Sequence, residues 1–166
     1  MTTEALDPSV GIVDDRAKLD TTILPSGQQK TYLVLSEAER RKGFTRPLRF
    51  SYTHVGKPAP KYTLRELTDE EIKRYNNGQP TEEHFVKYEP YPPGLNKSLG
   101  RLWTQADLDS IGKGCGTRTT MGRELAETYS RDFRFYGSTF CCGCREHLPV
   151  GEDGEFIWDD GERVGT

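Results

Sequence analysis

Three of the chain's four cysteines lie in one short stretch, Phe140–His147, with the sequence FCCGCREH. Cys141 and Cys144 have the C-x2-C separation that lets two thiolates bind one ion, and Gly143 relieves the tight backbone of such a turn. His147 follows after two further residues. Because structural Zn²⁺ is held tetrahedrally by Cys and His side chains, this stretch predicts three ligands of a zinc site.

The fourth ligand must come from elsewhere in the chain. Cys115, in the glycine-rich sequence GKGCGT, is the remaining thiol, and we expect the intervening helix and strand to bring it back to the cluster. Cys142 is interpreted as a spare thiol, since adjacent side chains seldom reach the same ion without strain. Cys142, His84 or an Asp remain alternatives for the fourth position. The predicted ligands of a structural Zn²⁺ are therefore Cys115, Cys141, Cys144 and His147.

Other chemistry for these residues is less well supported by the pattern. A redox pair of Cys141 and Cys144 would need a strand-to-helix junction in a βαβ unit, which the sequence lacks. A complete set of four protein ligands leaves no position for a water molecule, so the zinc is expected to be structural. His54 and His84 are interpreted as packed or surface histidines. With no nucleophile–base pair in view, we expect a protein that is not an enzyme.

The composition explains why such a site would be needed. Of the 166 residues, 33% are apolar and 30% are charged, and the mean hydropathy is −0.77, so the core must be thin for this length. A structural zinc site contributes on the order of 10 kcal/mol of binding free energy, which offsets part of the cost of ordering the chain. The net charge of −3 disfavours a protein that coats nucleic acid.

Two kinds of targeting segment are missing from the sequence pattern. No run approaches the roughly 20 apolar residues that a membrane span needs, and the first residues, MTTEALDPSVGIVDD, lack the basic start and apolar stretch of a signal peptide. We therefore expect no membrane partner and no secretion by a signal peptide, and a reducing cytoplasm as the compartment.

Short alternating and capped segments predict an α+β fold. Leu48, Phe50 and Tyr52 alternate with polar residues, as in a strand with one buried face. Ser36 and Glu39 form a capping box that predicts a helix start. Further strands are expected over 30–36, 133–140 and around 156–158, and further helices after Thr68, after Thr104 and along the stripe of Met121, Leu125 and Tyr129.

The composition also suggests a division of the chain. Residues 1–29 are polar with scattered Pro and Gly, and predict an extended N-terminal arm that lies along a partner or along its own core, of which we favour the partner. Residues 30–87 form an α+β N-terminal half, and 88–100 a proline-rich extended linker. Residues 101–166 form the C-terminal half with the zinc knuckle.

A basic cluster gives an alternative function. It interleaves cations with Phe44, Phe50 and Tyr52, a mixture that grips nucleic-acid backbones and stacks on bases. The competing interpretation is a solvated helix face followed by a strand with buried aromatic side chains, and an Arg- and aromatic-rich surface also suits a protein interface. The cations are Arg40, Arg41, Lys42, Arg46 and Arg49.

The C-terminal third resembles an uncharacterised family of small bacteriophage-encoded proteins. The shared pattern is an aromatic strand, F-C-x-x-C-x-x-H-x-P-V, an acidic turn, E-F-x-W and a glycine-rich tail, and the likeness extends over about Tyr32–Thr166. The resemblance implies that Cys141, Cys144 and His147 occupy metal-binding positions and that Cys115 matches an upstream cysteine. It implies no enzyme activity.

Together these features predict a zinc-stabilised binding or assembly protein, encoded by a phage. It would be a virion component, or a factor in the host cytoplasm that docks on a host protein. The alternative is a nucleic-acid-binding zinc-finger protein that uses the basic cluster.

Overall fold

The computed structural model describes residues 7–60, 69–70 and 105–166, and these form two compact units. The first unit comprises Met1–Gly56 and Gly114–Thr166, and the second comprises Lys57–Lys113. The second unit is thus an insertion in the sequence of the first. This division differs from the predicted boundaries at 30–87, 88–100 and 101–166, because those followed local composition whereas the first unit is built by pairing between distant strands.

Several sequence predictions lie outside the described residues. They include most of the helix expected after Thr68, of which only residues 69–70 are described, the proline-rich segment 88–100 and His84.

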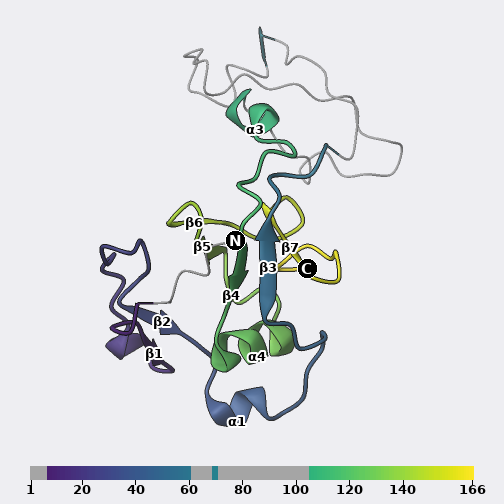
Figure 1. The fold of residues 1–166 in the computed structure, drawn as a ribbon. Helices are drawn as coiled ribbons and strands as arrows, with labels where there is room; N and C mark the ends of the chain where they lie inside the picture. Colours follow the sequence, from purple (N-terminus) through teal and green to yellow (C-terminus); the bar gives the residue numbers. More distant parts are fainter. Residues whose placement is uncertain (1–6, 61–68, 71–104) are drawn as a thin grey trace. The chain divides into compact units, whose positions relative to one another are not determined.

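A three-stranded antiparallel sheet forms the centre of the first unit (Figure 1). Its middle strand is β3 (Ser51–His54), flanked by β4 (Arg118–Thr120) and β7 (Phe156–Trp158). Tyr52 pairs with Thr119 on one side and with Trp158 on the other. A strand is present where the alternation predicted one, but it begins at Ser51, so Leu48 and Phe50 precede it. Tyr52 and His54 are buried on one side of β3, and Ser51 is buried on the other, so the strand does not have the single buried face that was expected.

Helix α4 (Arg123–Arg131) packs its apolar stripe into an aromatic core. The predicted stripe is confirmed, since Met121 and Tyr129 are buried and Leu125 packs against them. Tyr129 and Tyr52 each meet the Trp158 ring edge to face, with centroids 5.5 Å and 5.9 Å apart. We refer to this region as the aromatic core, whose buried residues are Tyr52, Met121, Ala126, Tyr129, Cys141, Phe156, Trp158 and Val164. With its short strands and helices, the fold belongs to the α+β class, as predicted.

Strands β5 (Ser138–Cys141) and β6 (Glu146–Pro149) form an antiparallel hairpin. The aromatic strand expected over 133–140 begins only at Ser138. Before it, Phe133 lies under the guanidinium of Arg46, 4.1 Å from its carbon to the ring centroid, and Tyr136 packs on Tyr129. The turn of this hairpin contains the C-x2-C sequence.

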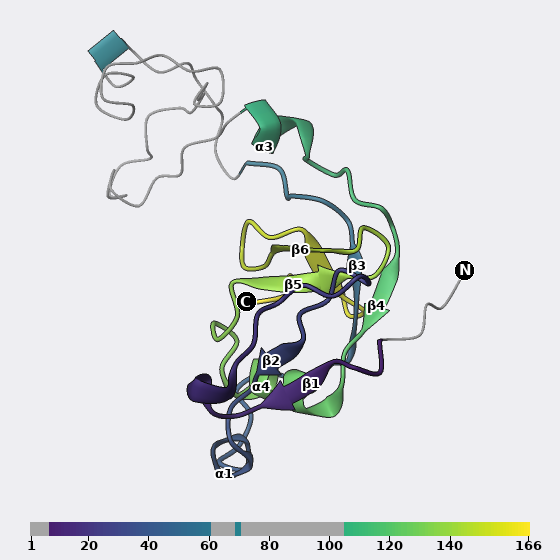
Figure 2. The ribbon, with the colours of Figure 1, turned by 90° about the vertical axis from the view of Figure 1, so that its left-hand side faces the viewer.

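The described part of the predicted arm contacts its own chain. Strand β1 (Gly11–Val13) pairs in parallel with β2 (Thr31–Leu33), and the short 3-10 helix η1 (Arg16–Lys18) lies between them in sequence (Figure 2). Tyr136 Oη donates to the Leu33 carbonyl oxygen (2.6 Å). The polar composition of residues 7–29 therefore reflects a thin two-stranded element rather than a segment without structure.

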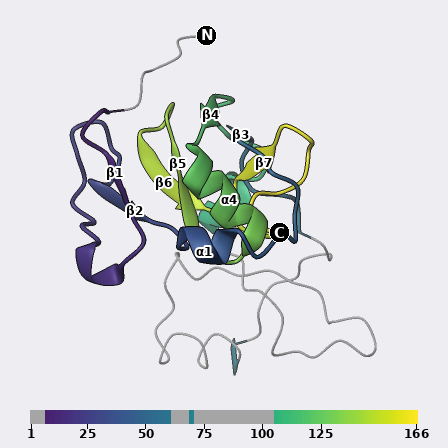
Figure 3. The ribbon, with the colours of Figure 1, turned by 90° about the horizontal axis from the view of Figure 1, so that it is seen from below.

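Helix α1 (Glu37–Arg40) begins where the capping box predicted, with Ser36 Oγ accepting the Glu39 amide hydrogen (3.2 Å). It lies beside α4 (Figure 3), where Arg40 and Glu127 form a half-buried ion pair of 3.0 Å.

In the second unit, helix α3 (Gln105–Asp109) corresponds to the helix expected after Thr104, and Lys57 pairs with Asp107. None of the described helices is long and apolar enough to cross a membrane.

Candidate metal centre

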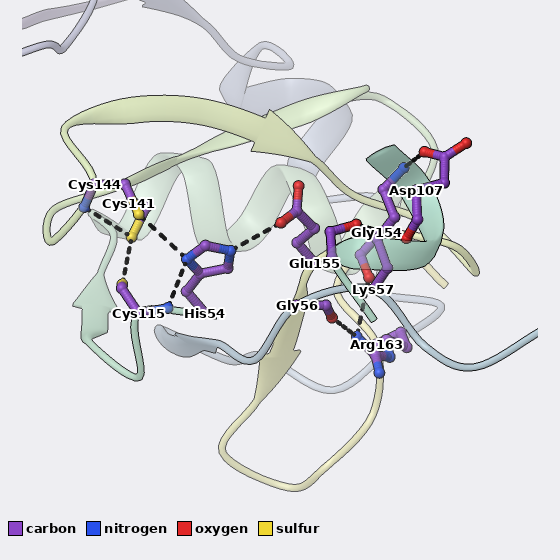
Figure 4. A network of polar contacts seen from close by, with 11 residues as sticks. His54, Gly56, Lys57, Asp107, Cys115, Cys141, Cys144, Gly154, Glu155 and Arg163 are labelled. Atoms are coloured by element: carbon purple, nitrogen blue, oxygen red, sulfur yellow. Dashed lines mark hydrogen bonds and ion pairs between the residues drawn. The ribbon is translucent and has the colours of Figure 1, made fainter. Parts of the chain in front are cut away.

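Four side chains from three parts of the first unit converge on one point (Figure 4). They are His54, Cys115, Cys141 and Cys144, whose ligand atoms all lie within 4.8 Å of one another. The Cys115 and Cys141 sulfurs are 3.4 Å apart, and the Cys144 sulfur is 3.4 Å from His54 Nδ1. A tetrahedral zinc ion would separate such donors by about 3.6 to 3.8 Å. The two measured distances are slightly shorter than this, and all four donors lie close enough together to surround a single ion.

The C-x2-C turn holds two of the sulfurs through its own backbone. The Cys144 amide points at the Cys141 sulfur (3.4 Å), and the Arg145 amide donates to the Cys141 carbonyl oxygen (2.8 Å). Arg145 has a φ of 58°, a left-handed conformation that is uncommon outside glycine. The turn thus places Cys141 and Cys144 on the same side with their sulfurs converging.

Glycines let the loop that contains Cys115 approach the end of β3 and the C-x2-C turn closely. A Cβ atom on Gly143 would lie 2.9 Å from the Cys115 sulfur and 2.8 Å from Thr117 Cβ, and one on Gly114 would overlap the His54 carbonyl group. The loop is fixed to β3 because the Gly116 amide donates to the His54 carbonyl oxygen (2.9 Å). The glycines around the cysteines are therefore required by close packing of the loops.

His54 lies at the end of β3 with its ring buried and both nitrogens engaged. Nδ1 accepts the Cys115 amide hydrogen (3.2 Å), so the ring proton of the neutral imidazole is on Nε2. Nε2 lies 3.0 Å from Glu155 Oε1, to which it donates. Metal-ligating histidines are usually oriented by a carboxylate in this way. The Nδ1 electron pair, which accepts the Cys115 amide hydrogen in this structure, also lies 3.4 Å from the Cys144 sulfur and would be the pair that binds an ion.

The pKa values of the three cysteine thiols are shifted in different directions. Partial burial raises the pKa of Cys115, but hydrogen bonds from Thr117, His54 and Cys141 outweigh it and lower the pKa to about 6. Burial raises the pKa of Cys141 to about 12 and also raises the pKa of Cys144. Without a cation, one thiolate at Cys115 is thus stabilised while its neighbours keep their protons. A bound divalent ion would favour the thiolate form of all of them.

Three of the four predicted ligands are brought together, and the fourth lies elsewhere. His147 is on β6 opposite Phe140, and its Nε2 is 2.8 Å from Tyr32 Oη, so its ring is directed to the N-terminal segment. His54 takes the place that the sequence interpretation gave to His147. Cys142 is directed away from the cluster, since its sulfur accepts a hydrogen bond from Thr119 Oγ1 (3.3 Å).

The sequence did carry a signal for His54. It continues the series Leu48, Phe50, Tyr52 by two more positions and therefore belongs to the buried face of the strand. A histidine at a core position needs a partner for each ring nitrogen, and such a partner was not visible from the sequence alone.

The basic cluster is largely neutralised within the first unit. Arg49 pairs with Asp160 and Glu162, and its guanidinium lies over the Trp158 ring. Arg46 donates to the carbonyl oxygens of Thr45 and Thr166. The remaining cations each pair with a carboxylate: Arg40 with Glu127, Arg41 with Glu37, and Lys42 with Glu39. This pairing favours the interpretation as a salt-bridged surface.

No protein-family model, curated protein or solved structure matches this chain. The function must therefore be argued from the geometry of the site.

Proposed function

We propose that the chain is a zinc-stabilised protein that acts by binding and assembly rather than by catalysis. The observation that carries the proposal is the convergence of His54 with Cys115, Cys141 and Cys144, all donor atoms lying within 4.8 Å of one another. Three thiolates and one imidazole form a donor set typical of structural zinc.

The choice of zinc follows from the donors. Thiolate sulfur favours soft or borderline ions, and a tetrahedral set of three sulfurs and one nitrogen suits Zn²⁺ better than Mg²⁺ or Ca²⁺, which take oxygen ligands. Four protein ligands complete a tetrahedral shell, so the ion would keep no position for a reacting water. Its role would be to hold the fold.

The position of the site supports that role. It joins the end of β3, the loop before β4 and the turn between β5 and β6, three segments that are distant in the sequence. The strands they belong to are only three or four residues long. Elements this short bury little apolar surface, and an ion that fixes three of them together offsets much of the ordering cost.

The binding and assembly role is supported by the resemblance to small phage proteins and by the interpretation of the metal as a scaffold. A virion component, or a factor that docks on a host protein, is consistent with both. Nucleic-acid binding is the second choice, because the cations that would serve it already have partners within the chain.

Metal analysis of the purified full chain tests the proposal. We expect one zinc per chain and an X-ray absorption spectrum fitted by three sulfurs and one nitrogen near 2.3 and about 2.1 Å. Native mass spectrometry with and without a chelator, on protein isolated from infected cells, tests the assembly role through the partner that co-purifies. A chain without metal, or a shell containing exchangeable water, would refute the structural-zinc proposal.

A further inference from the structure

A cavity of about 220 Å³ lies within the first unit, away from the four metal ligands. The N-terminal segment, α4 and β5 all contribute to its wall. Five aromatic residues line it: Tyr32, Tyr52, Tyr129, Tyr136 and Phe140. An apolar cavity of about 150 Å³ is large enough for a benzene molecule, so this one accommodates a single ring with a short chain.

The charged side chains among the described lining residues of the cavity are all acidic. Asp7 and Glu124 both line the cavity, and no Lys, Arg or His is among its described lining residues. Hydrogen bonds from Ser9 lower the pKa of Asp7, so this carboxylate is ionised at neutral pH. Aromatic rings present a negative face, which attracts organic cations. Carboxylates and ring faces therefore favour the same sign of ligand charge.

The tyrosine hydroxyls of the inner wall are not available to a ligand. Tyr136 donates to the Leu33 carbonyl oxygen, and Tyr52 donates to the Phe140 carbonyl oxygen. The Tyr129 hydroxyl is fully buried beside Thr139 and has no surface toward the cavity. The wall therefore offers a ligand the faces and edges of these rings.

We propose that this cavity binds a small organic cation, an amine attached to one apolar ring or short chain. The apolar part would lie among the tyrosine rings, and the carboxylates of Asp7 and Glu124 would supply the opposite charge. This site is independent of the metal centre and adds a small-molecule ligand to the proposed binding protein.

Three probes with the same ring and different head groups test the proposal: 2-phenylethylamine, 2-phenylethanol and phenylacetate. The chain has only two methionines, Met1 and Met121, and Met121 lines the cavity. In metal-loaded protein labelled at the methionine methyl groups, the Met121 resonance should shift and saturate with the amine, while Met1 serves as the internal control. We expect the amine to bind about three- to thirtyfold more tightly than the alcohol, and phenylacetate to bind most weakly.

Carboxylate variants test the source of the charge preference. The pair Asp7→Asn and Glu124→Gln should remove the preference for the amine over the alcohol, while 2-phenylethanol still binds. Glu152→Gln, which removes an exposed carboxylate outside the cavity wall, is the matched control and should leave the preference unchanged.

The outcomes are decisive in either direction. Saturable movement of Met121 with the amine, with the amine preference lost when Asp7 and Glu124 are replaced by their amides, supports the proposal. A Met121 resonance that none of the probes moves overturns the site. Equal binding of all three probes overturns the cation preference, and tighter binding of phenylacetate does the same.

Discussion

Strand β3 connects two regions that are held together by different physics. Tyr52 lies in the aromatic core, where rings from β7 and α4 surround it, and two residues later His54 lies in the metal centre. The core is stabilised in proportion to the apolar area removed from water. The metal centre has less such area, since Cys115 is exposed and Cys144 is only half-buried, and Cys141 is the fully buried residue that the two regions share.

This difference implies different responses to damage. Truncating a core side chain removes a share of the contacts and leaves the rest in place. Removing one of four ligands removes the ion, and with it the link between β3, the loop before β4 and the β5–β6 turn. We therefore expect graded losses in the aromatic core and an all-or-none loss at the metal centre.

The largest effect should come from Cys141→Ser, with Cys142→Ser as the matched control one residue away. Loss of zinc removes on the order of 10 kcal/mol of binding free energy, comparable to the whole stability of a small domain, so the first unit should fail to fold. Cys142→Ser should keep one zinc per chain and a nearly unchanged urea midpoint, because Cys142 is directed away from the cluster.

Treating the native chain with a strong chelator checks the same point without a mutation. Chelation should abolish the cooperative urea transition of the first unit, as in Cys141→Ser, and restored zinc should bring it back. If complete removal of the metal left the cooperative unfolding unchanged, the aromatic core alone would be sufficient for folding. The proposed difference between the two regions would then be refuted.

The next largest effect is expected for Trp158→Ala in the aromatic core. Trp158 is 2% exposed and meets two tyrosine rings edge to face, so its truncation should cost about 3 to 5 kcal/mol. The protein that remains folded should still bind one zinc. Ile157→Ala, at the half-buried position next to it in β7, should cost much less. Loss of zinc in folded Trp158→Ala would show that the two regions depend on each other.

The features that were predicted correctly from the sequence are those that depend on local geometry. The Ser36 cap, the apolar stripe of α4 and the C-x2-C turn each involve residues close together in the chain, and each is present. Three of the four convergent ligands were also predicted, because glycines and thiols mark the two loops.

The features that could not be predicted from the sequence depend on the register between strands that are distant in the chain. His54 meets Cys115 because β3 pairs with β4, and it meets Glu155 because β3 pairs with β7, about a hundred residues further along the chain. His147 has the favourable sequence spacing, but the β5–β6 register places it beyond the turn and opposite Phe140. Spacing along a loop thus predicted the sulfurs correctly and gave no information about which imidazole reaches them.

A smaller effect should follow Gly143→Ala, which adds one carbon between the two cysteine loops. The new Cβ would lie 2.9 Å from the Cys115 sulfur, so the loops must separate, with a cost of about 1 to 3 kcal/mol and weaker zinc binding. Gly137→Ala is the control, since a Cβ there meets nothing within 4 Å. Equal urea midpoints for the two variants would contradict the requirement for close approach of the loops.

Glu155→Gln should affect the ion more than the fold. The amide keeps the size of the side chain but weakens the hydrogen bond that orients His54 and raises its basicity, so zinc affinity should fall about 10- to 100-fold. Competition with a coloured chelator measures the affinity, and Glu152→Gln, an exposed position, gives the baseline. An unchanged affinity would mean that the Glu155 carboxylate plays no part in orienting the ligand.

The smallest effect, and the one that separates the two histidines, is expected for His147→Ala. This variant should keep one zinc per chain and lose about 1 kcal/mol, because it removes the hydrogen bond to Tyr32 and no ligand. In a double-mutant cycle with Tyr32→Phe, the two changes should couple by about 0.5 to 1.5 kcal/mol, since either one removes the same bond. His54→Ala should instead release the zinc. If His147→Ala releases zinc and His54→Ala retains it, the ligand set is the one that the loop spacing predicted. In that case β3 contributes side chains to the aromatic core and no ligand to the metal centre.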